Sequence, residues 1–121
     1  MNRTARHELA ERTFASRHVR PPARWIRAST TSPFDLAVLR PDGAQLRATF
    51  VEVKTAQGRR SSDLSEAEME FGQFAENHGC PYVIARYRVA GTEVIAEELY
   101  RPFANTDARQ PEVELQFEVS K

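Results

Sequence analysis

The strongest constraint on the fold of this chain is a tight turn between two strand-forming segments. The turn, Pro41-Asp42-Gly43, combines three residue types that favour reversal of the backbone. Residues 34–39 before it are mostly apolar, and residues 45–55 after it are rich in β-branched and aromatic side chains. The sequence therefore predicts a β-hairpin with a short first strand and a longer second strand.

One helix is predicted on each side of this hairpin along the chain. Residues 3–18 place apolar side chains at helical spacing, and Pro21-Pro22 ends that helix. The second helix begins at Ser65, which forms a capping box with Glu68 three residues later. It runs to about His78 and ends at a glycine.

Further strands complete the predicted order of elements. A short extended stretch surrounds Trp25, and residues 81–89 form an apolar strand. Residues 93–105 are interpreted as a short strand followed by a turn of helix. Residues 112–119 alternate strictly between apolar and acidic or amide side chains, which is typical of a half-buried strand. The order helix, strand, strand, strand, helix, strand predicts an α/β fold with a mixed sheet and an extra C-terminal strand.

Length and composition limit the class of protein. A chain of 121 residues is expected to form a single domain, 1–121, with a core at about 3–89 and a C-terminal extension at about 90–121. Cys80 is the only cysteine, which excludes an internal disulfide and a cysteine-rich zinc site. The sequence lacks a long uncharged apolar run and the apolar core of a signal peptide. We therefore expect a cytoplasmic protein without a membrane partner.

The charge is distributed unevenly along the chain, although the net charge is zero. Residues 1–60 contain twelve basic and five acidic residues, whereas residues 61–121 contain five basic and twelve acidic residues. A basic half would suit a phosphate-bearing partner such as nucleic acid. The alternative is that both halves form ordinary solvated faces that intermix in the folded protein.

The hairpin contains the residues with the most promising chemistry. Side chains alternate along a strand, so Glu52 and Lys54 lie on one face. If the hairpin loop is the residue pair Asp42-Gly43, Asp35 pairs with Phe50 and lies on that same face. A three-residue loop would place Asp35 on the opposite face.

Two carboxylates and an ammonium group on one sheet face suit a metal-dependent reaction. Asp35 and Glu52 offer the oxygen ligands that Mg²⁺ or Mn²⁺ accepts, and the carbonyl of Val53 is a further candidate ligand. Lys54 would hold an attacking water or balance the charge that develops on a phosphate. The alternative is an exposed strand pair beside an aspartate that caps a turn.

The first helix offers a third carboxylate, Glu8 or Glu11. Glu8 is preferred because it lies beside the apolar positions Leu9 and Ala5, and the alternative is a solvated helix face. The three histidines, of which His7 is the first, have no metal-ligand spacing to one another.

Sixteen residues separate Asp35 from the triplet Glu52-Val53-Lys54. This spacing, together with the predicted order of helices and strands, resembles the PD-(D/E)XK nuclease superfamily. Within it, the chain is similar to the protein NO VEIN C-terminal domain family. The residues that carry this similarity are Phe34-Asp35-Leu36, Phe50-Val51-Glu52-Val53-Lys54-Thr55, Leu64-Ser65-Glu66-Ala67-Glu68-Met69-Glu70-Phe71 and Pro81-Tyr82-Val83-Ile84-Ala85-Arg86-Tyr87. The archaeal Holliday junction resolvases share the same type of hairpin.

The resemblance implies a restriction-endonuclease-like core with defined roles for four residues. Asp35 and Glu52 would be metal ligands, Lys54 the catalytic lysine, and Glu8 or Glu11 the acid of the first helix. Two departures from the family pattern remove no ligand. Pro33-Phe34 stands where the family usually has glycine-tyrosine, and Gly72 stands where it has alanine.

The sequence favours Mg²⁺-dependent hydrolysis of DNA phosphodiester bonds as the function. The first alternative is a catalytically silent nuclease-like domain that binds nucleic acid or protein. The second is a structural domain that dimerises through a strand edge. A homodimer or a larger multidomain partner is compatible with the nuclease interpretation, and duplex, single-stranded, branched DNA and RNA are all open as substrates.

Overall fold

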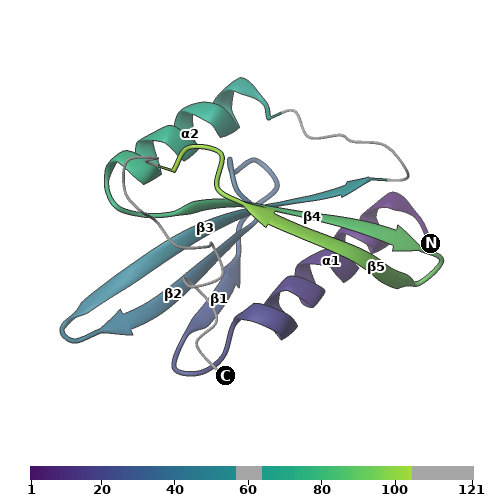
Figure 1. Ribbon diagram of the computed structural model, residues 1–121, viewed down its shortest axis with the longest axis horizontal. Helices are drawn as coiled ribbons and strands as arrows, with labels where there is room; N and C mark the ends of the chain where they lie inside the picture. The colour runs from purple at the N-terminus through teal and green to yellow at the C-terminus, as the bar shows by residue number, and fades with distance from the viewer. Residues whose placement is uncertain (57–63, 105–121) are drawn as a thin grey trace.

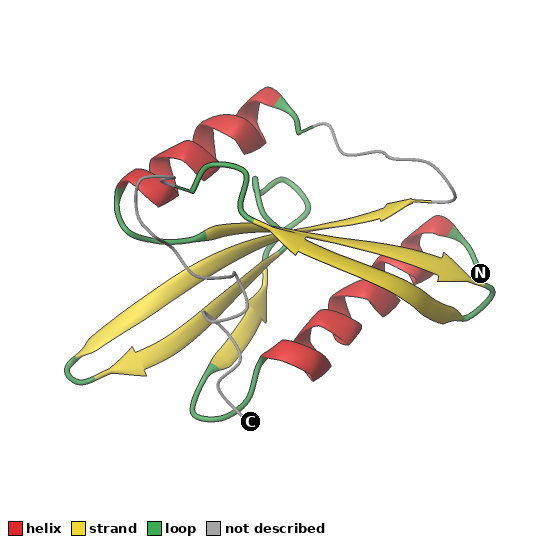
Figure 2. Cartoon of the chain, viewed as in Figure 1, coloured by secondary structure: helices red, strands yellow, loops and turns green. Residues whose placement is uncertain are grey.

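The computed structural model describes residues 1–56 and 64–104 (Figures 1 and 2). Neither helix in these ranges is long and apolar enough to cross a membrane. The predicted strand at 112–119 lies outside the described residues. The helices and strands, in chain order, are α1 (Arg3–His18), β1 (Arg24–Arg27), β2 (Leu36–Asp42), β3 (Gln45–Ala56), α2 (Glu66–Asn77), β4 (Tyr82–Ala90) and β5 (Glu93–Tyr100).

The strands form one mixed sheet in the order β1-β2-β3-β4-β5. Only β3 and β4 pair in parallel, because α2 carries the chain back between them, and the other neighbours are antiparallel. The two helices cover opposite faces of the sheet in Figures 1 and 2. The prediction of an α/β fold with a mixed sheet is confirmed.

The hairpin between β2 and β3 forms with a different loop from the one expected. Asp42 pairs with Gln45, so the two loop residues are Gly43 and Ala44. Gly43 has a φ of +63°, and a type II′ turn requires a positive φ at this first loop position. The expected pairing of Asp35 with Phe50 is therefore wrong, since Phe50 pairs with Ala37.

The helix boundaries follow the capping signals closely. Helix α1 spans the predicted residues, and its first turn is capped by the side chain of Asn2. At the start of α2, the hydroxyl of Ser65 accepts a hydrogen bond from the backbone N–H of Glu68, and the Glu68 carboxylate accepts one from the N–H of Ser65. The predicted capping box is confirmed. Strand β5 takes up most of 93–105, and its end is followed by a turn rather than a helix.

The two faces of the sheet are packed differently. Under α1, Phe14 packs with the buried side chains of the strands, which include Val51 and Val53. On the other face, an aromatic cluster lies under α2, and its members are Phe34, Phe50, Phe71, Tyr82 and Phe103. Because side chains alternate along β3, Glu52 and Lys54 lie on the aromatic, α2-facing side.

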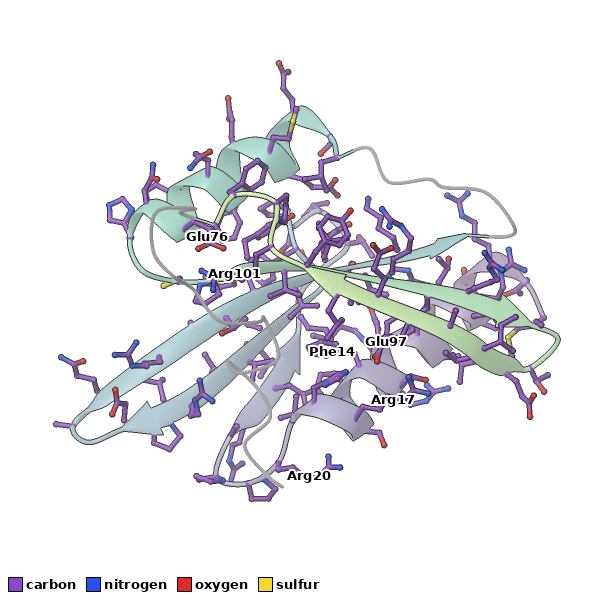
Figure 3. All side chains as sticks on the ribbon, in the orientation of Figure 1. Phe14, Arg17, Arg20, Glu76, Glu97 and Arg101 are labelled. Atoms are coloured by element: carbon purple, nitrogen blue, oxygen red, sulfur yellow. The ribbon has the colours of Figure 1, made fainter. Side chains whose placement is uncertain are left out.

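Glu97 connects α1 to the distal strands of the sheet (Figure 3). Its Oε2 lies 2.9 Å from Nε2 of His18 and accepts a 2.7 Å hydrogen bond from the Tyr87 hydroxyl. Its Oε1 lies 3.3 Å from a guanidinium nitrogen of Arg17. Burial opposes ionisation of Glu97, but the hydrogen bonds from His18 and Tyr87 and the charges of His18 and Arg17 outweigh it and lower the pKa to about 2.

We expect the contacts of Glu97 to make the free energy of unfolding depend on pH in the acid range. A folded-state pKa below the ordinary value of 4.5 stabilises the folded protein above about pH 4.5, and this contribution is lost as the pH falls toward 2. It is worth at most about 3 kcal/mol. Urea unfolding at several pH values should therefore show a stability difference between wild type and Glu97→Gln that shrinks below pH 4.5. A difference that does not change with pH would contradict the assignment.

Candidate functional site

Asp35 lies immediately before β2, where the ladder between β2 and β3 ends. Its backbone N–H donates a 2.8 Å hydrogen bond to the carbonyl of Val51. Two residues further along β3, the N–H of Val53 donates a 2.7 Å hydrogen bond to Oδ2 of Asp35. The Asp35 carboxylate thus takes the place of a backbone acceptor. This bond fixes the orientation of the carboxylate and leaves Oδ1 available for other contacts.

The segment that precedes Asp35 is held against the α2 side of the sheet. The hydroxyl of Tyr82, in β4, donates a 3.0 Å hydrogen bond to the carbonyl of Pro33. The ring of Phe34 packs against Phe50 and Phe71, with centroids 4.8 Å and 5.3 Å apart. The Pro33-Phe34 pair therefore serves as a hydrophobic anchor for the aspartate.

Glu52 and Lys54 form an ion pair in a largely buried setting. Nζ of Lys54 lies 3.2 Å from Oε2 of Glu52 and 3.5 Å from Oε1 of Glu68. The Glu52 side chain is 8% exposed and the Lys54 side chain is 19% exposed. Glu68 therefore has two roles, because the same oxygen that closes the capping box of α2 also contacts Lys54.

The electrostatics connect these residues to Asp35. Burial raises the pKa of the Glu52 carboxyl well above its usual range, and the nearby charge of Asp35 raises it further against the opposing charge of Lys54. Burial disfavours the charged form of Lys54, but the carboxylates of Glu52 and Glu68 outweigh this effect and raise its pKa. Asp35, Glu52 and Lys54 thus lie in one region, and their catalytic roles stay predictions.

The first-helix acid in this region is Glu11 rather than the preferred Glu8. Glu8 is exposed, whereas the Glu11 side chain is 5% exposed and its Oε1 accepts a 2.8 Å hydrogen bond from Nε of Arg27. The preference for Glu8 relied on the apolar residues Ala5 and Leu9. The buried face of α1 instead runs through Ala10, Glu11 and Phe14, so Glu11 points toward the sheet.

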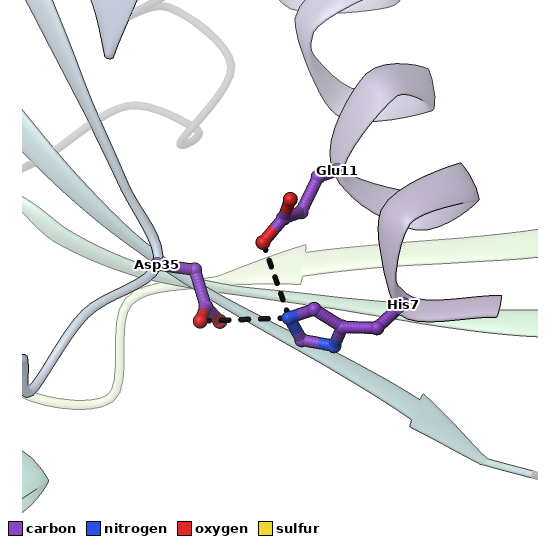
Figure 4. A group of neighbouring side chains, drawn as sticks. All are labelled: His7, Glu11 and Asp35. Atoms are coloured by element: carbon purple, nitrogen blue, oxygen red, sulfur yellow. Dashed lines mark ion pairs between the residues drawn. The ribbon is translucent and has the colours of Figure 1, made fainter. Parts of the chain in front are cut away.

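His7 joins the same region and was not identified from the sequence. Its Nε2 lies 3.2 Å from Oε2 of Glu11 and 3.5 Å from Oδ1 of Asp35 (Figure 4). The hydrogen bond with Asp35 raises the pKa of His7 despite partial burial. The available signal was the four-residue spacing between His7 and Glu11, which places both side chains on one helix face. Spacing between the histidines themselves gives no such indication.

The donor set of the site fits a divalent cation. The carboxylates of Glu11 and Asp35 both contact His7, and those of Glu52 and Glu68 both contact Lys54. Carboxylate oxygens are the ligands that Mg²⁺ prefers. The peptide of Val53 lies at the site through its bond to Asp35, but its carbonyl as a ligand stays a prediction.

One hollow in the described part of the chain lies away from these residues. Its volume is about 1150 Å³, and it lies between the C-terminal end of α2 and the hairpin half that contains Arg40 and Arg47. None of the site residues lines it.

No protein-family model matches this chain, and no curated protein matches it. Among solved structures, the chain is similar to a Holliday junction resolvase from the archaeal hyperthermophile Archaeoglobus fulgidus. The two are 20% identical with a TM-score of 0.43, and the match covers 65% of this chain and 64% of that one. The chain thus spans less than two-thirds of the length of the resolvase. The similarity to the NO VEIN C-terminal domain family stays a prediction.

Proposed function

We propose that this chain is a nuclease that uses a divalent metal ion to hydrolyse DNA phosphodiester bonds. The observation that carries the proposal is the hydrogen bond from the backbone N–H of Val53 to the Asp35 carboxylate, because Val53 stands between Glu52 and Lys54, whose side chains form an ion pair. The same three residues carry the resemblance to the PD-(D/E)XK superfamily. We also propose that DNA is the partner of this chain and that the protein acts in the cytoplasm.

Asp35 and Glu52 would hold the ion, Mg²⁺ or Mn²⁺, with the Val53 carbonyl as a further ligand. Asp35 is held in place for this role, because its Oδ2 accepts a hydrogen bond from the Val53 N–H and its Oδ1 lies 3.5 Å from Nε2 of His7. Bound there, such an ion polarises a phosphodiester and lowers the pKa of a bound water. Glu52 is the more buried ligand and would exclude water from one side of the ion.

Lys54 is the group that can act on the reacting phosphate. Its ammonium is held by Glu52 and Glu68, and its side chain is 19% exposed, so it can donate to an attacking water or to a phosphate oxygen. A fixed donor aimed at developing negative charge stabilises the transition state without reorganising solvent. Glu68 orients Lys54 from the start of α2.

The proposal is tested by metal titration and plasmid nicking on the same protein samples. We expect wild type to bind Mg²⁺ or Mn²⁺ saturably in calorimetry and to nick supercoiled DNA only when the metal is present. Glu52→Gln removes a charged ligand while keeping the side-chain volume, so metal affinity should fall at least about tenfold and nicking by about 100-fold or more. Glu8→Gln is the matched control, because Glu8 is exposed outside the site.

The outcomes separate the two leading interpretations. Metal binding that Glu52→Gln weakens, together with metal-dependent nicking, supports the nuclease. Metal binding without cleavage of duplex, single-stranded, branched DNA or RNA favours the silent binding module instead. If wild type and Glu52→Gln are equally folded and neither binds metal, the proposed metal centre is wrong.

A further inference from the structure

We infer that the hollow beside the β2–β3 hairpin is a docking site for residues 112–119 of this same chain. The hollow has a volume of about 1150 Å³ and lies between the C-terminal end of α2 and the hairpin half that contains Arg40 and Arg47. Residues 112–119 are the predicted half-buried strand and lie outside the described residues. The inference goes beyond the proposed function, because it requires neither a metal ion nor DNA.

The course of the chain leads into this hollow. Residues 101–104 all line it, and Ala104 is the last residue that the structure describes. Residues 105–111 connect Ala104 to Glu112, and seven extended residues can span roughly 24 Å. The segment therefore reaches the hollow without any change in the described residues. A segment tethered this closely has an effective concentration on the order of millimolar, so a weak interaction is enough to hold it there.

The hollow offers an exposed apolar surface. Leu46 lines it and is 64% exposed, the highest value among the exposed large hydrophobic side chains of the described residues. Ala48, Pro81 and Phe103 extend the apolar lining. Every second residue from Val113 to Val119 is apolar, and a strand that alternates in this way needs such a surface under its apolar face.

The charges of the hollow and of the segment are complementary. Arg40 and Arg47 line the hollow and lie directly opposite each other in the β2–β3 ladder, where like charges destabilise a sheet. Arg47 forms a 2.6 Å ion pair with Asp42, which offsets one of the two positive charges. Residues 112–119 contain three acidic residues and no basic residue. A docked segment would therefore bring negative charge to a hairpin end that has a surplus of positive charge.

Two other occupants compete with this segment. A nucleic-acid backbone would also suit the two arginines, and a second copy of the chain would also suit the apolar lining. The apolar lining favours the segment over a phosphate backbone, because phosphates gain nothing from apolar contact. The direct connection through Ala104 favours the same chain over a second copy, because tethering raises the effective concentration.

The test measures how well the hollow is covered in the full chain. Cys80 lines the hollow and is the only cysteine, so the rate of its reaction with the thiol reagent DTNB reports access to the hollow. Phe117→Asn removes an apolar side chain from the segment and should raise this rate at least about fivefold. Gln116→Asn is the matched control, because it changes the neighbouring residue on the polar face and should leave the rate within about twofold of wild type.

A second pair of variants tests the same contact from the side of the hollow. Leu46→Asn should also raise the reaction rate of Cys80 at least about fivefold, because it makes the docking surface polar. Ile95→Asn is its matched control, since Ile95 is 55% exposed in β5 and does not line the hollow. In the wild type, nuclear Overhauser effects should connect the Phe117 ring to side chains that line the hollow.

The inference is wrong if Phe117→Asn and Gln116→Asn react at the same rate and no Overhauser effect connects Phe117 to the hollow. A difference between these variants that disappears on dilution assigns the hollow to a second copy and overturns it. Protection of Cys80 by duplex DNA, with no effect of Phe117→Asn, assigns the hollow to nucleic acid and also overturns it. None of these readouts depends on metal binding or cleavage, so failure of the proposed nuclease activity leaves the result intact.

Discussion

Glu76→Gln is expected to lower the free energy of unfolding by about 3–5 kcal/mol, the largest stability effect that we predict for a single substitution. Glu76 lies near the end of α2 and forms a two-pronged ion pair with Arg101, which follows β5 (Figure 3). Oε1 lies 2.6 Å from Nη2 of Arg101, and Oε2 lies 2.9 Å from Nε. The glutamine would leave the guanidinium without its counter-charge.

Burial makes this pair more consequential than a surface ion pair. The side chains of Glu76 and Arg101 are 6% and 10% exposed, so water cannot replace a lost partner efficiently. Oε2 of Glu76 also accepts a 3.0 Å hydrogen bond from the backbone N–H of Tyr82, the first residue of β4. One carboxylate thus connects α2 to the start of β4 and to the segment after β5.

Urea unfolding followed by circular dichroism measures the loss, because urea leaves ionic interactions unscreened. Glu70→Gln is the matched control, since Glu70 is exposed on the same helix and should change stability by less than about 0.5 kcal/mol. The double substitution Glu76→Leu with Arg101→Met should be less destabilised than Glu76→Gln, because no charge is then left buried alone. A loss below about 1 kcal/mol in Glu76→Gln would show that the pair is solvated in solution.

The fold was accessible from the sequence wherever local chemistry determines the backbone. Ser65 and Glu68 define the start of α2 because their side chains satisfy the free N–H groups of that turn. The hairpin was expected from its turn residues, but the loop was misplaced by one position. The requirement for a positive φ at the first loop position selects Gly43, and glycine adopts this conformation more readily than aspartate.

Side-chain partners across the fold were harder to foresee. Glu11 and Arg27 meet because α1 packs over the sheet next to β1, and nothing in the spacing of 16 residues indicates that contact. His7 was overlooked for the same reason, since its partner Asp35 is distant in sequence. Asp35, Glu52 and Lys54 were identified because they belong to one hairpin, where strand alternation relates their positions.

Lys54→Met is expected to reduce metal-dependent DNA cleavage by about 100- to 1000-fold while Mg²⁺ affinity stays within about tenfold of wild type. The methionine keeps much of the aliphatic stem between Glu52 and Glu68 but removes the ammonium that both carboxylates hold. Losing one preorganised donor to a developing oxyanion typically costs this much in rate. Both proposed metal ligands, Asp35 and Glu52, remain, so binding and cleavage should separate.

Lys54→Arg sharpens this prediction by restoring charge without restoring shape. A guanidinium is planar and offers several N–H donors, whereas an ammonium is a compact point charge. Nζ of Lys54 lies 3.2 Å from Glu52 and 3.5 Å from Glu68. If charge alone mattered, the arginine variant would recover most of the cleavage rate. We expect it to recover less than about a tenth of it, because the guanidinium cannot place one N–H on the reacting water in the same position. Equal loss of Mg²⁺ affinity and cleavage in Lys54→Met would instead make Lys54 a structural counterion of Glu52 and count against its catalytic role.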